Sequence, residues 1–261
     1  AIFDQMDSAT QAVVDITAAG IIPAALEMMD HTTIEAIERG APVGFPRDAE
    51  AVLIVEVEGL GEQTERSMNL ARAVCERNGA REVRMAKDET ERQLLWKGRK
   101  GAFGAMGALA PNYYVQDGVV PRSKLSQVLR KVYETCERYG LPVANVFHAG
   151  DGNLHPNLLF DERKPGETAR VLEVGAEIMR LCVDAGGSIT GEHGVGVEKI
   201  DQMCVQFGTA ELEAFHAIKR VFDPKGLLNP GKAVPLLSRC AEFGRRHVRA
   251  GRLDHPDLPR F

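Results

Sequence analysis

The sequence has few cysteines, no long apolar run and no excess of positive charge. Its five cysteines include no C-x-x-C pair, which argues against a zinc ribbon or a disulfide scaffold and favours buried thiols in a reducing compartment. No apolar run approaches the roughly 20 residues of a membrane span, and no signal peptide opens the chain. The net charge of -5 argues against a nucleic-acid-binding surface. We therefore expect a cytoplasmic protein without transmembrane segments or nucleic-acid partners.

Nucleotide-binding motifs are also missing. The sequence has no G-x-G-x-x-G between a strand and a helix with an acid about 20 residues later, and no G-x-x-x-x-G-K-[ST]. Any nucleotide cofactor must then be bound mostly by something outside this chain. The chain begins with Ala1 in a polar, helix-like segment, from which we expect that it is cut from a longer protein.

What is present is an alternation of strand and helix patterns in a chain with ordinary globular composition, 44% hydrophobic and 26% charged. The patterns predict an α+β fold, a mainly antiparallel sheet covered by helices on one side, in one domain. The expected strands are 24–29, 50–58, 82–86, 112–120, 142–148 and 154–160. The expected helices are 8–20, 32–39, 64–78, 89–100, 123–139 and 166–185, with two shorter ones after residue 187 that include 210–221.

The densest chemical pattern is the segment VFHAGDGNLHP, residues 146–156. His148 ends one expected strand and His155 lies just inside the next, so a glycine-rich turn between paired strands can bring both imidazoles to one face. Two histidines suit zinc, manganese or iron but need a further ligand. Two histidines that make only hydrogen bonds in a hairpin are the structural alternative.

A second pattern is the glycine-rich segment GGSITGEHGVG, residues 186–196. Glu192 is a candidate for the missing anionic metal ligand, and His193 would then be free to take a proton near the metal. A solvated loop with an ordinary Glu–His pair is the alternative.

The chain resembles the C-terminal domain of FAD-linked oxidases of the vanillyl-alcohol oxidase type in three sequence motifs, which occur in the order HAGDGNLHP, GGSITGEHGVG and FDPKGLLNPGK. The resemblance covers essentially the whole chain. The segments RKGAF, PNYY before Asp117-Gly118, and RCAEFG near the end are most similar to flavoprotein subunits of glycolate oxidases, a group related to D-lactate dehydrogenases. The fold that this resemblance implies is a cap, or substrate, domain with ferredoxin-like elements.

The resemblance also implies roles for individual residues. His148, His155 and Glu192 would bind a divalent metal, with zinc expected and manganese and iron as alternatives. His193 would take the substrate's hydroxyl proton, and Arg99 would hold the substrate carboxylate. The residues next to the flavin would be Asn229, Lys232 and His193. The strand 113–117 lacks the lysine that some relatives carry there.

The resemblance implies an FAD-dependent 2-hydroxyacid dehydrogenase or oxidase, which converts glycolate or a short D-2-hydroxyacid such as D-lactate to the 2-oxoacid. The FAD-binding domain would precede residues 1–261, and 236–261 would be a C-terminal extension. The isolated chain should then be colourless and inactive. The implied partners are that FAD-binding domain, a second flavin-like subunit and an iron–sulfur subunit, with peripheral attachment to the inner membrane through them. A homodimer is a further expectation.

Two other functions remain open from the residues alone. A metal-dependent hydrolase could use His148, His155 and Glu192 with a metal-bound water, and it would need no flavin. A non-catalytic module that binds a metal or a small acid would use the same residues without turnover.

Overall fold

The computed structural model describes residues 1–235; residues 236–261, with the expected C-terminal extension, lie outside the described part. The strands are β1 (Ile2–Phe3), β2 (Ala25–Asp30), β3 (Ala51–Glu56), β4 (Ala80–Glu82), β5 (Asn112–Val115), β6 (Gly118–Val119), β7 (Val143–His148), β8 (Asn153–Leu154) and β9 (Pro156–Phe160). The α-helices are α1 (Met6–Ala18), α2 (His31–Gly40), α3 (Gly61–Arg77), α4 (Glu89–Ala105), α5 (Leu125–Tyr139), α6 (Glu167–Asp184), α7 (Met203–Gln206) and α8 (Thr209–Phe222). Short 3₁₀ turns occupy Met106–Ala108 and Arg122–Lys124.

The strands form one antiparallel sheet in the order β4-β1-β3-β2-β7-β8-β6, with β9 pairing with β7 and β5. The expected α+β class is therefore confirmed. The strand expected over 112–120 is divided into β5 and β6 at Gln116 and Asp117. The strand expected over 154–160 is divided into β8 and β9 at His155. Both interruptions lie beside each other in the sheet, because Gln116 N–H donates to the Pro156 carbonyl.

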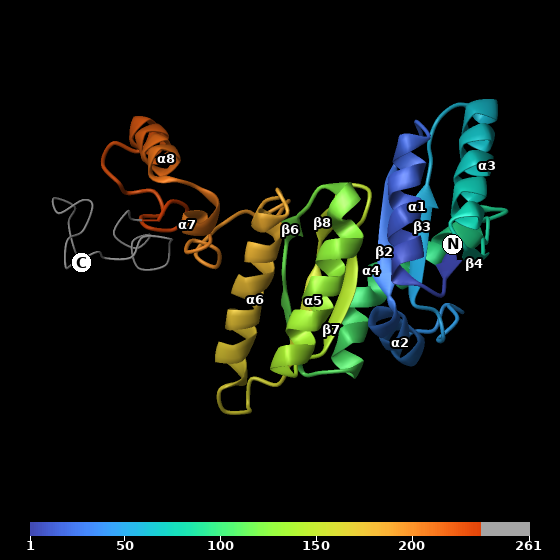
Figure 1. Cartoon of the computed structure of the whole chain (residues 1–261), viewed down its shortest axis with the longest axis horizontal. Coiled ribbons are helices and arrows are strands. Elements are labelled where there is room, and N and C mark those ends of the chain that lie inside the picture. Colours follow the sequence, from blue (N-terminus) through green and yellow to red (C-terminus); the bar gives the residue numbers. More distant parts are fainter. Residues whose placement is uncertain (236–261) are drawn as a thin grey trace.

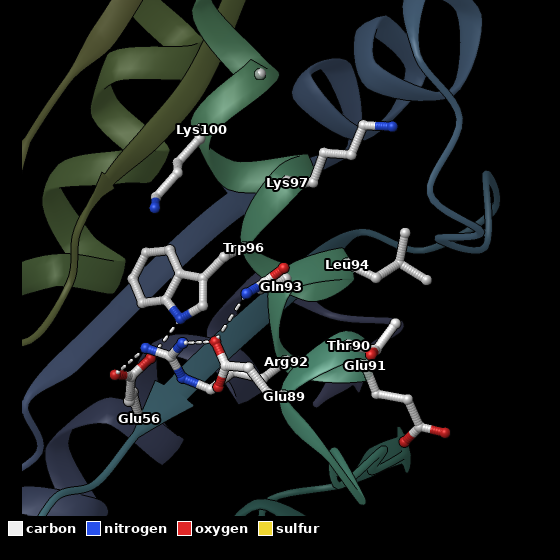
Figure 2. Close-up of a pocket in the computed structure, with 11 residues that line it drawn as sticks. Glu56, Glu89, Thr90, Glu91, Arg92, Gln93, Leu94, Trp96, Lys97 and Lys100 are labelled. Carbon is white, nitrogen blue, oxygen red and sulfur yellow. Dashed lines mark hydrogen bonds and ion pairs between the residues drawn. The ribbon is translucent and has the colours of Figure 1, made fainter.

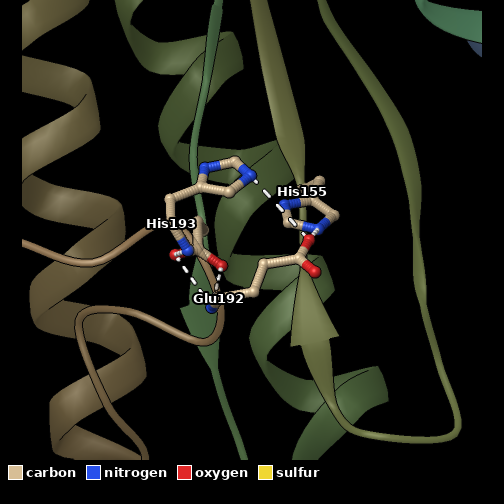
Figure 3. Close-up of side chains that lie close together, drawn as sticks. His155, Glu192 and His193 are labelled. Carbon is tan, nitrogen blue, oxygen red and sulfur yellow. Dashed lines mark hydrogen bonds and ion pairs between the residues drawn. The ribbon is translucent and has the colours of Figure 1, made fainter.

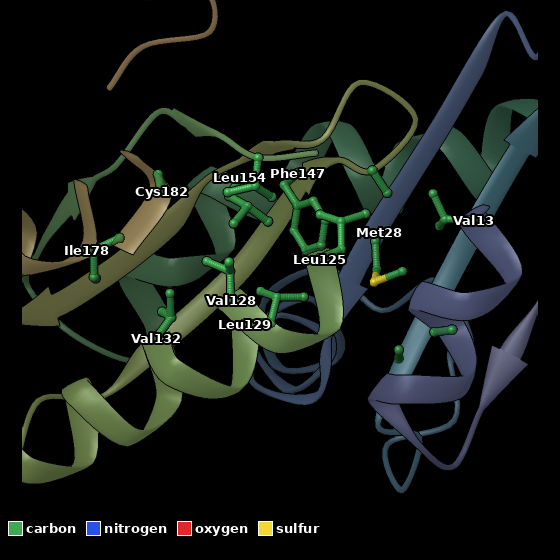
Figure 4. Close-up of a cluster of buried hydrophobic side chains, with 14 of the residues drawn as sticks. Val13, Met28, Leu125, Val128, Leu129, Val132, Phe147, Leu154, Ile178 and Cys182 are labelled. Carbon is green, nitrogen blue, oxygen red and sulfur yellow. The ribbon is translucent and has the colours of Figure 1, made fainter. Parts of the chain in front are cut away.

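Helices cover both faces of the sheet, whereas the sequence patterns led us to expect helices on one side only. Figure 1 shows α3, α1, α5 and α6 side by side along one face. Their apolar side chains pack with Phe147, Met28 and Leu154 in the larger core cluster (Figure 4). Helices α2 and α4 pack against the opposite face, in a second cluster that includes Met29 and Val146. The helical periodicity of α2 and α4 was visible in the sequence, but it does not say which face of a sheet a helix will cover.

Several element boundaries differ from the sequence expectations. Helix α1 begins at Met6, with Gln5 at its N-cap, rather than at Ser8. Strand β4 ends at Glu82, where the expected strand began. The turn between β7 and β8 is as tight as its glycines predicted: Gly152 has φ of +71°, and a Cβ there would lie 2.1 Å from the Val120 carbonyl oxygen.

Figure 1 shows that α7 and α8 extend beyond α6, away from the rest of the sheet. Among residues 1–235, no helix is both long and apolar enough to cross a membrane. Three of the five cysteines, Cys75, Cys136 and Cys182, are buried free thiols.

Two helical glycines allow a direct test of this packing. A Cβ on Gly104 in α4 would meet no atom within 4 Å, whereas a Cβ on Gly175 in α6 would lie 2.8 Å from Tyr114 Cε1 and 2.9 Å from Gln116 Nε2. Gly104→Ala should stabilise the fold by about 0.5–1 kcal/mol, since alanine loses less backbone entropy in a helix. Gly175→Ala should destabilise it by roughly 1–3 kcal/mol through overpacking. Denaturant unfolding of both variants measures the two shifts, and shifts of the same sign would contradict this packing.

Candidate functional site

Strand alternation places four polar side chains on the sheet face that carries α2 and α4. Glu27 on β2 is directly opposite His148 on β7. His155, between β8 and β9, lies beside the interruption that contains Asp117. In each strand the flanking residues, such as Phe147 and Leu154, turn to the opposite face and its larger core cluster. The expected pairing of His148 and His155 is confirmed in space: their ring centroids are 5.4 Å apart.

His148 is oriented by Glu27. The Nδ1 atom of His148 lies 2.7 Å from Glu27 Oε1, and its Nε2 atom lies 3.5 Å from Glu192 Oε1. Burial acts to raise the pKa of Glu27, but the hydrogen bond from His148 and the charge of Arg99 lower it overall. An ionised carboxylate can only accept, so Nδ1 carries a proton. The same hydrogen bond raises the pKa of His148.

His155 is oriented by a backbone carbonyl group. Its Nδ1 atom lies 2.9 Å from the Gln116 carbonyl oxygen, which can only accept, so Nδ1 is the protonated nitrogen. Its Nε2 atom lies 3.0 Å from Glu192 Oε1. The side chain is only 2% exposed, and burial lowers its pKa, which favours the neutral ring. In that form the Nε2 lone pair is directed at a carboxylate oxygen, and such a contact needs a shared proton or a cation between the two atoms.

Glu192 and His193 reach this place from the loop that follows α6. Figure 3 shows the side chains of Glu192 and His193 directed toward His155. The ring of His193 stacks on that of His155 with centroids 5.2 Å apart and an interplanar angle of 14°. His193 Nε2 lies 3.8 Å from Glu192 Oε1. Both loop side chains are about half exposed, at 51% for Glu192 and 48% for His193, so a small molecule can reach them.

The cluster has the chemistry of a divalent-metal site. Ligand atoms of Asp117, His155, Glu192 and His193 all lie within 4.8 Å of one another. This geometric set differs from the one expected from sequence, which has His148 in place of Asp117 and His193. We favour His148 over Asp117, because both oxygens of Asp117 already accept hydrogen bonds from the loop. Neutral imidazoles with a carboxylate are a usual zinc ligand set.

Arg99 lies next to the cluster in α4. Its side chain is 10% exposed, and its Nε atom donates to Glu27 Oε2 at 2.8 Å. Glu27 therefore joins Arg99 to His148. Within residues 1–235 the guanidinium hydrogen-bonds through Nε alone, so its two terminal nitrogens are available to a carboxylate, which a guanidinium can bind in a bidentate manner.

One helical turn away on α4, Trp96 makes the corresponding contact with the next strand. Its indole N–H donates to Glu56 at the end of β3, and Arg92 pairs with the same carboxylate at 3.0 Å (Figure 2). These residues and Lys100 line an open hollow of about 1080 Å³. None of its lining residues belongs to the histidine cluster. Glu56 and Glu27 thus fix α4 against two neighbouring strands.

Asn229 and Lys232 are not brought to the cluster. They follow α8, in a turn where Asn229 has φ of +47° and Lys232 N–H donates to the Asn229 carbonyl. Asp223 organises the preceding turn by accepting from the backbone N–H groups of Leu227 and Leu228. Both Asn229 and Lys232 are exposed.

Sequence reasoning missed two site residues. Glu27 and Asp30 are the two acids of the strand ALEMMD, which is otherwise apolar, and a buried acid in such a strand can indicate a functional site. Asp117 was noted only as part of a family phrase. Its sequence separation from Glu192 gives no hint that the two lie in contact.

The family described as FAD linked oxidases, C-terminal domain, matches residues 1–233. Over 259 residues, 99% of this chain and 52% of the relative, the sequence is 51% identical to glycolate oxidase subunit GlcD of Escherichia coli (strain K12). The identity is 39% to glycolate oxidase subunit GlcD of Bacillus subtilis (strain 168), over 89% of this chain and 49% of the relative. It is 32% to a D-lactate dehydrogenase of Archaeoglobus fulgidus, over 89% of this chain and 50% of the relative.

The chain thus spans about half the length of the curated relatives that it matches. Among solved structures, 4-ethylphenol oxidase from Gulosibacter chungangensis superposes with a TM-score of 0.65 at 18% identity, covering 90% of this chain and 53% of that one. At this identity the likeness concerns the fold alone.

The contact between Glu27 and His148 can be measured directly. Glu27→Gln removes the carboxylate whose hydrogen bond raises the pKa of His148, so that pKa should fall in the variant. NMR titration of the imidazole resonances in chelator-treated protein gives both values. His155 makes its Nδ1 hydrogen bond to Gln116 instead, and its resonance is the internal control. An unchanged pKa of His148 would contradict the contact.

Proposed function

This chain belongs to the FAD-linked oxidases, whose C-terminal domain it carries, and we propose that it forms the substrate side of an enzyme that oxidises glycolate or a short D-2-hydroxyacid, such as D-lactate, to the 2-oxoacid. The relatives named as glycolate oxidase subunits and D-lactate dehydrogenase support both substrates.

We assign FAD binding to a separate half of the protein that precedes this domain. The relatives are about twice as long as the stretch that this chain matches, and the chain has no dinucleotide-binding motif. Exposed Asn229 and Lys232, together with His193, are the residues of this chain that we assign to the flavin. FAD, when bound, accepts a hydride at its ring.

The observation that carries the proposal is the convergence of His148, His155 and Glu192. The Nε2 atoms of the two histidines lie 3.5 and 3.0 Å from one oxygen of Glu192. Their Nδ1 atoms form hydrogen bonds with Glu27 and with the Gln116 carbonyl, so that both Nε2 atoms face the Glu192 carboxylate. These three residues would hold a divalent cation, for which zinc is the best match to the ligand types. Such a cation lowers the pKa of a hydroxyl group placed against it.

His193 is the base in this proposal. Its exposed ring stacks against His155, and its Nε2 atom is near the same Glu192 oxygen. A 2-hydroxyl group bound at the cluster would therefore lie within reach of an imidazole, which removes its proton as the hydride leaves C2. Half exposure keeps the ring accessible to substrate.

Arg99 binds the substrate carboxylate. Its position is set from one side by Glu27 and from the other by the face of Phe103, whose centroid lies 5.9 Å from the guanidinium carbon. Because Glu27 holds both Arg99 and His148, the carboxylate and the 2-hydroxyl group of one small acid could be bound together. Such fixed placement of C2 lowers the entropic part of the barrier.

Further subunits are part of the proposal. Two of the relatives are named as subunits, and we propose a complex with a second flavin-like subunit and an iron–sulfur subunit that accept the electrons. Attachment to the inner membrane would then be peripheral, through those partners.

The test uses a protein that carries both the flavin-binding half and this chain. Under anaerobic conditions, glycolate and D-lactate should reduce the flavin and so bleach its absorbance. His193→Ala should slow that reduction by about 10²–10⁴-fold, the usual contribution of a positioned base, with a much smaller effect on the half-saturating substrate concentration. His31→Ala, a histidine outside the cluster, is the matched control. A near-normal rate in His193→Ala would refute the assignment of the base, and failure of both acids to bleach the flavin would refute the function.

A further inference from the structure

The loop that carries Glu192 and His193 is tied to the sheet through one carboxylate. Asp117 Oδ2 accepts hydrogen bonds from the Thr190 hydroxyl at 2.7 Å, from Gly191 N–H at 3.1 Å and from His193 N–H at 3.0 Å. Asp117 Oδ1 accepts from Glu192 N–H at 3.2 Å. Three consecutive backbone N–H groups thus point at the same side chain, an arrangement that binds an anion well.

A buried lysine completes this arrangement. Lys199 Nζ lies 3.1 Å from Asp117 Oδ2 and 3.3 Å from the Asp117 carbonyl oxygen. Asp117 is fully buried and Lys199 is 4% exposed. Both carboxylate oxygens therefore accept hydrogen bonds from the loop, and most of these bonds converge on Oδ2.

We propose that Asp117, with Lys199, is a positioning residue that fixes the turn 190–193 so that Glu192 and His193 face His155. The inference rests on the proposed function for what Glu192 and His193 do. It goes beyond that function in assigning Asp117 to the loop, although its oxygens lie close enough to the cluster to count as metal ligands. A cation bound to Asp117 Oδ2 would compete with the hydrogen bonds that this oxygen accepts from the turn.

The position of Asp117 in the sheet explains how one residue can act on the whole site. It adjoins Gln116, whose carbonyl oxygen accepts from His155 Nδ1. The interruption between β5 and β6 therefore orients His155 through a backbone carbonyl and the loop through the next side chain. Packing fixes the loop from the other side: a Cβ on Gly191 would lie 2.5 Å from the Asn153 side chain, so the turn fits closely against β8.

Metal affinity of the 261-residue chain is the first measurement. Asp117→Asn keeps the shape but replaces one acceptor oxygen with an NH₂ group that faces donors. Zinc, titrated in competition with a chromophoric chelator, should bind the variant about 10–100-fold more weakly, the usual effect of losing an outer-shell partner. Asp184→Asn, an exposed acid at the end of α6, is the control and should bind zinc like the original chain.

If Asp117→Asn does not fold, Lys199→Met is the second variant. It removes only the positive charge beside Asp117, and it should also weaken zinc binding several-fold. Zinc affinity within twofold of the original chain in the folded variant would overturn the inference.

Amide hydrogen exchange separates this inference from the proposed function. In metal-free protein, the amides of Gly191, Glu192 and His193 should exchange markedly faster in Asp117→Asn, because their acceptor is weakened, while amides of β2 and β7 should not change. If the original chain binds no zinc, the proposed metal site fails, and the exchange rates alone decide the inference. Unchanged exchange at residues 191–193 in the variant would overturn it, whatever the zinc result.

Discussion

The register between neighbouring antiparallel strands determines where each polar group of the site lies. Glu27 is opposite His148, and the turn through Gly152 returns the chain so that His155 comes to the same face. A shift of one residue in any of these pairings would turn the side chain into the apolar core on the other face. The larger core cluster, with Phe147 and Leu154 in alternate positions, opposes such a shift. The geometry of the site is therefore a consequence of core packing.

The acidic side chains of the site have two different roles: some orient other residues, and one faces the place where a ligand could bind. The Glu27 carboxylate pairs with His148 and Arg99, and the Asp117 carboxylate pairs with Lys199 and with the loop. An unpaired carboxylate at either position would be costly to bury. Glu192 differs from both, because it is half exposed and faces the Nε2 atoms of two histidines. The inner acids thus orient the site, whereas the outer acid and the imidazoles remain free to bind a ligand.

The sequence predicted the parts of this site that are local. The hairpin 142–160 and the approach of His148 to His155 follow from strand patterns and glycines over a short segment. Contacts between distant segments could not be predicted in this way: Glu27 lies 121 residues before His148, and Asp117 lies 75 residues before Glu192. Periodicity likewise predicted α2 and α4, but not the sheet face that they cover. For Glu192, the glycine-rich segment 186–196 suggested a metal ligand, and the family resemblance implied that it binds with the two histidines, but no local pattern places this segment against them.

We propose above all that His148, His155 and Glu192 together form one metal site. Anomalous diffraction at the zinc edge, from crystals of the chain grown with zinc, tests it most directly. We expect one strong peak bonded to Nε2 of His148, to Nε2 of His155 and to a Glu192 oxygen, each at about 2.0–2.2 Å, with Asp117 still bound to the turn 190–193. A peak bonded to Asp117 with that turn released, or no peak at the histidines, would contradict it.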